Sequence, residues 1–184
     1  MNRKLGQAFL IAAAFVFFSC KTLGKTDTYP EPSVILEPPV PQTNLPVIEF
    51  SGLGIKYEFE SMLLNRFLVI QDTDASGKFA ARLMDETSWA KVRILFPAGT
   101  YECLAAEKSF NPDQAAFYIY IDEEAHRVYP SNPPLGKWEL TTRSPIYFTL
   151  DAPKEVLVTV QANSKDRLGE TGMDLDYIQF VKRR

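Results

Sequence analysis

Apolar and polar residues alternate along most of the chain from Glu49 onwards. A period of two predicts β-strands that bury one face. Segments rich in Gly, Pro, Asn and Asp separate the alternating runs, as turns do, and no run has the period of an amphipathic helix. The predicted strands cover residues 55–60, 67–71, 78–84, 91–96, 100–106, 117–122, 146–150, 156–161 and 174–182. This pattern predicts an all-β domain over residues 49–184, built as an antiparallel β-sandwich or jelly roll.

The first 19 residues have the pattern of an export signal. Arg3 and Lys4 give a cationic start, and residues 8–18 are all apolar. A membrane-spanning helix needs about 20 apolar residues, so this shorter run predicts a cleaved signal peptide over residues 1–19.

The apolar run ends in Phe17, Phe18, Ser19 and Cys20. These residues resemble the lipobox of bacterial lipoproteins, in which the Cys is acylated and becomes the new N-terminus. The resemblance implies lipidation at Cys20, and therefore a membrane-attached protein of the bacterial cell envelope, at the outer membrane or the periplasmic leaflet. Plain secretion with an incidental Cys20 is the alternative.

Residues 20–48 differ in composition from the segments on either side, because they hold six of the chain's 13 prolines. Proline-rich segments favour extended polyproline II. We therefore expect the lipidated Cys20 to be followed by a spacer that holds the domain away from the bilayer.

Charge and cysteine content narrow the classes of function. The formal net charge is −3, and the only basic cluster lies in the last three residues, 182–184. This balance predicts no nucleic-acid partner. Once Cys20 is acylated, Cys103 remains alone, so no intramolecular disulfide is expected. Its place in an alternating run predicts a buried, inert thiol.

Five short motifs occur in a fixed order between residues 55 and 182. They are Tyr57-Glu58-Phe59-Glu60, Ala75-Ser76-Gly77, Trp89-Ala90-Lys91-Val92, Pro97-Ala98-Gly99-Thr100-Tyr101 and Leu175-Asp176-Tyr177-Ile178. Together they resemble the carbohydrate-binding modules of families 6 and 35, which are jelly rolls of the galactose-binding-like type. The resemblance covers nearly the whole domain and implies carbohydrate binding without catalysis.

Two pairs of acidic residues are candidate metal ligands. Glu58 and Glu60 lie two apart on one predicted strand, and Asp174 and Asp176 lie two apart on another, so strict alternation places each pair on one face. Oxygen ligands without nearby Cys or His suit Ca²⁺. The resemblance implies that the first and last strands are neighbours and that Glu58, Glu60 and Asp176 hold a structural Ca²⁺, with Asp174 close by. In the alternative interpretation the acids are solvated or paired with basic neighbours, Lys56 or Arg66.

A sugar site needs exposed rings beside polar side chains, because sugars stack on aromatic faces and form hydrogen bonds through their hydroxyls. By the resemblance, Phe79 takes the position of a ring in the loop cleft of these modules. Tyr129 is a second candidate ring, and Asn163 and Asp174 are the candidate polar partners. Prolines stand where the modules carry a loop Trp.

The other large aromatic residues are predicted to be structural. We expect Trp89 and Trp138 to fill the core. Tyr118 and Tyr120 alternate with apolar neighbours. They are therefore expected to face outward, where they either pack across strands or form a second aromatic surface.

The sequence gives little basis for catalysis. The chain has one histidine, His126, and it lies in a charged stretch, residues 123–127, that has the composition of a solvated turn. A catalytic triad would depend on this residue alone, so we expect no enzyme. The main hypothesis is a lipid-anchored envelope protein whose jelly roll binds glycan without catalysis. The alternative is the same fold used for contacts with envelope proteins, without sugar binding.

Overall fold

The computed structural model describes residues 45–129, 135–162 and 172–183. The predicted signal peptide, Cys20, nearly all of the predicted linker and Asn163 lie outside these residues. The described part contains thirteen strands, β1 (Val47–Glu49), β2 (Lys56–Glu58), β3 (Leu63–Asn65), β4 (Phe67–Gln71), β5 (Phe79–Leu83), β6 (Trp89–Phe96), β7 (Gly99–Lys108), β8 (Phe117–Ile121), β9 (Glu124–Val128), β10 (Glu139–Leu140), β11 (Ile146–Leu150), β12 (Lys154–Ala162) and β13 (Asp174–Arg183). Three short 3-10 helices accompany them, η1 (Phe59–Ser61), η2 (Ser76–Lys78) and η3 (Pro112–Ala115). Within the described ranges, no helix is both long enough and apolar enough to span a membrane.

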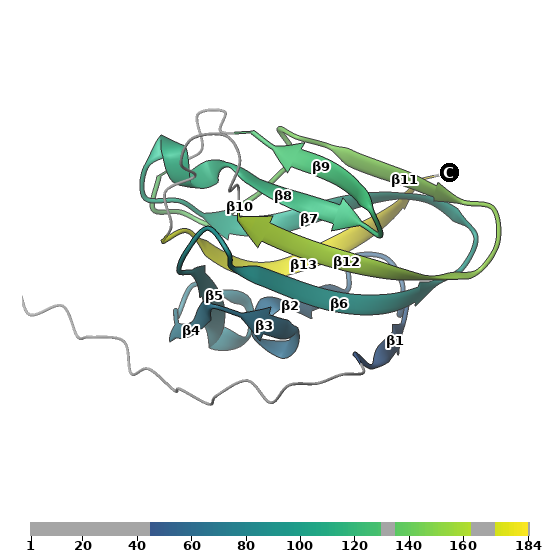
Figure 1. The fold of residues 1–184 in the computed structure, drawn as a ribbon, viewed down its shortest axis with the longest axis horizontal. Helices are drawn as coiled ribbons and strands as arrows, with labels where there is room; N and C mark the ends of the chain where they lie inside the picture. The colour runs from purple at the N-terminus through teal and green to yellow at the C-terminus, as the bar shows by residue number, and fades with distance from the viewer. Residues whose placement is uncertain (1–44, 130–134, 163–171, 184) are drawn as a thin grey trace, which may run out of the picture. The chain divides into compact units, whose positions relative to one another are not determined.

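The strands form two sheets, which Figure 1 shows as two layers. Sheet A has the order β1-β6-β12-β8-β9, and β3 also pairs with β6. Sheet B has the order β10-β7-β13-β5-β4, with β11 also paired to β7 and β2 to β13. The pairings are antiparallel except for β1 with β6, which is parallel. This arrangement confirms the predicted all-β antiparallel sandwich.

The predicted strands are all present, and their ends agree to within two residues at every strand. In the run 55–60, β2 ends at Glu58 and η1 follows. The prediction of a turn around His126 is wrong, because these residues form β9. Strand β1 begins at Val47, inside the segment that composition assigns to the linker.

The main core lies between the two sheets, and a cluster of aromatic rings joins them. The Phe96 ring centroid is 4.9 Å from the centroids of Tyr101 and Phe180 and 5.4 Å from that of Phe148. Edge-to-face ring pairs contribute about 0.5–1.5 kcal/mol each beyond their buried area. Because Phe96 belongs to sheet A and the other three to sheet B, these contacts fix how the sheets stack. Cys103 is fully buried in the same core, and burial raises the pKa of its thiol to about 12.

Strand β13 contains a bulge between Leu175 and Ile178, where its register with β7 shifts. Both residues face the main core, although strict alternation would place them on opposite faces. One extra residue therefore changes the phase of the strand. As a consequence, the side chains of Asp174 and Asp176, on either side of Leu175, lie in different environments.

Candidate functional site

Glu58, Glu60 and Asp176 gather around the loop that contains Ser76. The Ser76 backbone N–H donates to Asp176 Oδ2 at 2.8 Å, and its hydroxyl donates to Glu58 Oε1 at 2.8 Å. Glu58 ends β2, which pairs with β13, whereas Glu60 belongs to η1. The 3-10 turn, and not strand alternation, therefore brings Glu60 to this cluster. Phe59 between them is fully buried in the main core.

Burial and like charge raise the pKa of two carboxyls in this acidic cluster. Desolvation, together with the charges of Glu58 and Asp176, raises the pKa of Glu60 to about 7. The pKa of Asp176 is raised to about 6, mainly by desolvation and also by Glu58, while the Ser76 N–H and Lys56 lower it. Each of the three carboxylates keeps one buried oxygen without a hydrogen-bond partner, Glu58 Oε2, Glu60 Oε2 and Asp176 Oδ1. The cluster thus holds more negative charge than its surroundings compensate.

Gly77 allows the Ser76 loop to pass close to Glu60. Its φ of 64° lies in the left-handed region, which glycine enters without strain. A Cβ atom at this position would lie 3.3 Å from Glu60 Oε1. A larger residue at 77 would therefore strain the backbone and displace the Glu60 carboxylate.

The acidic cluster contains the type of oxygen ligand that a calcium site needs, but its side chains are not arranged around a common point. Its unpartnered atoms are all carboxylate oxygens, the ligands that Ca²⁺ takes. Across the described ranges, however, no three His, Cys, Asp or Glu side chains are arranged to hold a metal ion as they stand. Of the two basic neighbours considered from sequence, Lys56 donates to Ser76 Oγ at 3.1 Å. Arg66 lies elsewhere and pairs with Asp85 at 2.8 Å.

Asp174 is held by Arg82 and not by the acidic cluster. Arg82 donates from Nε to Asp174 Oδ1 at 2.7 Å and from Nη2 to Oδ2 at 3.0 Å. Burial raises the pKa of Asp174, and Arg82 counteracts that shift. Both carboxylate oxygens are therefore committed to an ion pair.

A cleft of about 250 Å³ adjoins the acidic cluster. Trp138, which the sequence predicts to be in the core, lines this cleft and is only partly buried. It packs against a small second cluster formed by Ile70, Ala75 and Ala80. The Lys108 ammonium lies 4.8 Å from its ring centroid. Lys56, Asp74, Ser76, Ala106, Glu139, Leu140, Asp176 and Tyr177 complete the lining.

The two predicted sugar-binding rings lie in different sheets. Phe79 begins β5 in sheet B, is half-buried, and has the phase of the core residues Ala81 and Leu83. Tyr129 follows β9 of sheet A, and 55% of its surface is exposed. Phe79 and Tyr129 therefore come from different layers of the sandwich.

Sheet A carries a row of aromatic and polar side chains, of which the sequence predicts Tyr129 as a sugar-binding ring and offers Tyr118 as part of a second aromatic surface. Trp89 pairs with Gln161, Gln161 with Tyr118, and Tyr118 with Arg127. Residues opposite one another on paired strands share a face of the sheet. The Trp89 and Tyr118 side chains are two strands apart, about 10 Å. The Arg127 guanidinium lies 5.0 Å from the Tyr129 ring centroid, so Tyr129 continues the row.

A second row runs beside the first on the same outer face. Thr159 pairs with both Lys91 and Tyr120. Tyr118 and Tyr120 have ring centroids 6.0 Å apart, and they face outward, as their alternation predicts. Trp89 is partly exposed, contrary to the expectation that it fills the core, and Lys91 Nζ lies 4.4 Å from its ring centroid. We name this surface the aromatic face, formed by Trp89, Lys91, Tyr118, Tyr120, Arg127, Tyr129, Thr159 and Gln161.

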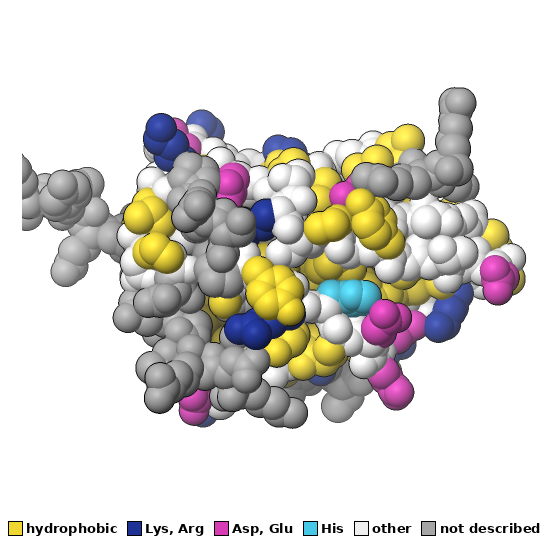
Figure 2. Space-filling model, turned by 90° about the horizontal axis from the view of Figure 1, so that it is seen from above, with side chains coloured by type: hydrophobic (Ala, Val, Ile, Leu, Met, Phe, Trp, Pro, Cys, Tyr) yellow, Lys and Arg dark blue, Asp and Glu magenta, His cyan; other side chains and the backbone are white. Residues whose placement is uncertain are grey.

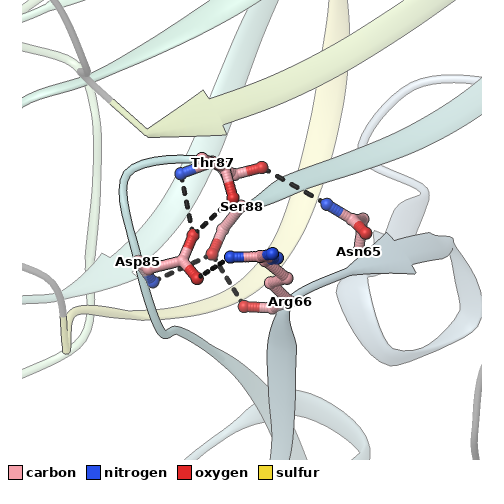
Figure 3. A network of polar contacts seen from close by, with 5 residues as sticks. All are labelled: Asn65, Arg66, Asp85, Thr87 and Ser88. Atoms are coloured by element: carbon pink, nitrogen blue, oxygen red, sulfur yellow. Dashed lines mark hydrogen bonds and ion pairs between the residues drawn. The ribbon is translucent and has the colours of Figure 1, made fainter.

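A network of hydrogen bonds fixes the start of β6 and hence the position of Trp89 (Figure 3). Ser88 Oγ donates to the Arg66 carbonyl at 2.7 Å and accepts from the Asp85 N–H at 3.0 Å. Asp85 Oδ1 accepts from both the N–H and the hydroxyl of Thr87, at 2.8 and 2.7 Å. The turn immediately before Trp89 is thus tied to the corner between β3 and β4.

His126 lies on β9, whose register pairs it with Ile119. Its Nε2 is 3.6 Å from Glu124 Oε1. Figure 2 shows a histidine side chain on the surface seen from above, with acidic side chains beside it and hydrophobic side chains around it.

No family model matches this chain, and no curated protein matches it either. Solved structures do resemble it. A family 35 carbohydrate-binding module from Clostridium thermocellum has a TM-score of 0.56 and 12% identity, and the match covers 70% of this chain and 98% of the module. The C-terminal family 6 module of LamC, a marine laminarinase from Zobellia galactanivorans, has a TM-score of 0.54 and 16% identity, with coverage of 70% and 98%.

Larger enzymes also contain a matching region. The exo-β-1,3-galactanase of Phanerochaete chrysosporium, in complex with β-1,3-galactotriose, has a TM-score of 0.55 and 13% identity. The match covers 71% of this chain and only 29% of the galactanase. At these identities the likeness defines the fold. The described domain is a jelly roll of the type found in carbohydrate-binding modules of families 6 and 35.

Proposed function

We propose that this domain binds carbohydrate without catalysis, through the aromatic face of sheet A. The observation that carries the proposal is the row in which the rings of Trp89, Tyr118 and Tyr129 alternate with Gln161 and Arg127. Aromatic rings stack on the apolar faces of pyranoses, while amide and guanidinium groups form hydrogen bonds with hydroxyls. The spacing of about 10 Å between Trp89 and Tyr118 suits an extended chain of several sugar units.

The fold supports this proposal, because two of the matching structures are carbohydrate-binding modules matched over 98% of their length. The charge of the aromatic face indicates which class of carbohydrate it binds. Lys91 and Arg127 are its two ionised residues, and both are cations. We therefore propose that acidic polysaccharides bind at least as well as neutral ones, with an affinity that falls as salt screens the cations.

The test is binding of the full chain to an array of neutral and acidic glycans, followed by affinity measurements on the best ligand. Trp89→Ala and Tyr118→Ala should each weaken binding about tenfold, which corresponds to a stacking contribution of about 1.4 kcal/mol. Trp138→Ala is the matched control, because this partly exposed Trp directly precedes β10 of sheet B and should leave the affinity unchanged. Equal losses in all three variants would contradict the assignment to the aromatic face.

Protein contact is the second candidate function, and exposed apolar side chains favour it. Val47, Ile48, Leu53 and Ile55 are exposed by 42, 41, 60 and 41%. A groove of about 200 Å³ is lined in part by Ile48 and Met62, and also by Lys91 of the aromatic face. Exposed apolar groups of this kind are typical of interaction sites. If no glycan binds at millimolar concentration, this candidate replaces the first.

We also propose that the domain is tethered to the bacterial envelope through an acylated Cys20. The support is the sequence alone: a signal-like start, a lipobox-like end and a proline-rich segment before the domain. An anchored binding domain fits both candidate functions, because attachment to one surface raises the local concentration of ligands on that surface.

Calcium binding at the acidic cluster is a further part of the proposal. Glu58, Glu60 and Asp176 would hold the ion, which would supply the positive charge that their unpartnered oxygens lack. The side chains would have to rotate to form a common ligand set. A proton on Glu60 or Asp176 is the competing way to relieve the repulsion, in accord with their raised pKa values.

A further inference from the structure

Both backbone polar groups of Tyr129 are bound by a single turn, residues 141–144. The Tyr129 N–H donates to Ser144 Oγ at 2.9 Å. The Tyr129 carbonyl accepts a hydrogen bond from Arg143 Nε. The ring itself takes no part in these bonds and stays exposed on the aromatic face. The turn therefore sets the position of Tyr129 without covering it.

This turn is fixed to the opposite sheet. Thr141 is fully buried, donates from its N–H to the Ala105 carbonyl at 2.9 Å, and accepts from the Ala105 N–H through Oγ1 at 3.0 Å. Ser144 is linked back to Thr141 by an N–H to carbonyl bond of 3.1 Å. Ala105 belongs to β7 of sheet B, whereas Tyr129 follows β9 of sheet A. The turn thus joins one ring of the aromatic face to the neighbouring layer.

Arg143 is itself held between two carboxylates. It forms an ion pair with Glu107 and a second one with Glu139 at 2.7 Å. Glu107 is fully buried on β7, and Glu139 lies directly opposite it on β10. On the other side of β7, the residue paired with Glu107 is the uncharged Leu175. Among the described residues, Arg143 and Glu139 are the charged groups that act on Glu107, and one guanidinium serves two carboxylates and a carbonyl.

We propose that Arg143 is a positioning residue that fixes Tyr129 in the aromatic face, and that the charge of Glu107 controls how tightly Arg143 is held. The effect on carbohydrate affinity rests on the proposed function, whereas the effect on Tyr129 does not. Burial raises the pKa of Glu107 to about 7, with Arg143 lowering it and Glu139 raising it. Below this pH a proton on Glu107 removes one of the two ion pairs of Arg143 and loosens its hold on the Tyr129 carbonyl. Above it, both ion pairs are complete.

The first test needs no ligand. In the full chain, the backbone ¹⁵N–¹H signal of Tyr129 should titrate between pH 5.5 and 8.5 with a midpoint near 7. Glu107→Gln should flatten this titration. Arg143→Lys keeps a cation but loses the Nε donor, so the Tyr129 amide should exchange with solvent about tenfold faster. Lys154→Gln, which removes an exposed ion pair with Asp122, is the matched control and should change neither result. A Tyr129 signal that is insensitive to pH and to Arg143→Lys would overturn the proposal.

The second test measures affinity for the best glycan from the array. Arg143→Lys should weaken binding about threefold to tenfold, and it should add no further loss in the Tyr129→Ala background. Additive losses would overturn the claim that Arg143 acts through Tyr129. If wild type binds no glycan, the proposed function fails, while the Tyr129 titration and exchange rates still decide whether Arg143 positions that residue.

Discussion

Arg82 and Asp174 face each other across β5 and β13 and form a two-point ion pair. Arg82 donates to both carboxylate oxygens of Asp174, at 2.7 and 3.0 Å. The Asp174 side chain is 1% exposed, and the Arg82 side chain is 32% exposed. The Phe110 ring lies over the guanidinium, with its centroid 5.6 Å away. The geometry fixes the planar guanidinium against a buried charge.

Removing the cation from this pair should be costly. Arg82→Met leaves the Asp174 carboxylate buried without a partner, so we expect the free energy of unfolding to fall by about 3 kcal/mol. Urea denaturation measures this loss. Adding Asp174→Leu to Arg82→Met should recover most of it, because no charge is then buried. Lys154→Met, which breaks an exposed pair, should cost less than about 1 kcal/mol, and a similar cost for both single variants would argue against a buried charge at Asp174.

Glu107 should make the domain less stable as the pH rises through neutrality. Its pKa in the folded state is about 7, raised from the ordinary value of 4.5. The folded state therefore holds this proton more tightly than the unfolded state. The resulting stabilisation is complete below about pH 4.5 and is lost as the pH rises through 7, by up to about 3 kcal/mol.

Urea unfolding at pH 5 and pH 8 measures this slope. Glu60 and Asp176 contribute in the same direction because their pKa values are also raised. Glu107→Gln should therefore reduce the slope without abolishing it, and replacement of the exposed Glu86 by Gln should leave it unchanged. A full slope in Glu107→Gln would show that the buried carboxyl is not its source.

Hydrophobic alternation predicted the central strands of both sheets, most of which have one face against the main core, and also the edge strand β4. The four strands it did not predict are short or lie at an edge. Strand β9 illustrates the reason: its core-facing positions are Glu124, His126 and Val128, of which only the last is apolar and fully buried. An edge strand with so little buried surface has no two-fold hydrophobic pattern to detect.

The acidic cluster depended on two local irregularities that alternation cannot reveal. Glu60 reaches the cluster through the 3-10 turn after β2, and Asp176 through the bulge in β13. Both features break the period of two. The resemblance to known modules indicated the acids that gather in the cluster. It could not indicate that Asp174 lies apart from them, because that separation results from the change of phase in β13.

The aromatic face was partly visible in the sequence. Trp89 is in the opposite phase to Val92, Ile94 and Phe96, so a strand extended back to residue 89 would have placed this ring outward. The neighbour of Trp89 across the sheet could not be inferred in the same way, because the sequence of one strand does not determine its register with a distant strand. Gln161 and Tyr118 were therefore not recognised as parts of one row.

Cys20 offers a direct test of the envelope anchor. Cys20→Ala should release the protein from the membrane fraction, because stable attachment needs the acyl chains that this residue would carry. Fractionation of cells that express wild type or variant measures the change. Cys103→Ala is the control, since this thiol is buried in the core. Mass spectrometry of a mature wild-type N-terminus without acyl chains would refute the anchor.

Calcium should stabilise the domain if the acidic cluster binds it in the folded state alone. By mass action, Ca²⁺ at about 100 times its dissociation constant adds about 2.7 kcal/mol, which raises Tm by roughly 5–10 °C. Chelator should reverse this shift. Glu60→Gln should abolish it, whereas Asp74→Asn, at the rim of the adjoining cleft, should retain it. Identical melting curves of wild type in calcium and in chelator would remove the metal from the proposal.

Phe79 and Tyr129 distinguish the loop cleft expected from sequence from the aromatic face. Tyr129 has an exposed ring beside Arg127, so Tyr129→Ala should weaken carbohydrate binding about fivefold to tenfold with little change in Tm. Phe79 is half-buried in phase with the core residues of β5, so Phe79→Ala should lower Tm by several degrees and leave the affinity unchanged. Affinity measurements below the melting transition of both variants separate the two effects. If Phe79→Ala abolishes binding while Tyr129→Ala has no effect, the site lies in the loops of sheet B and the aromatic face is not the ligand surface.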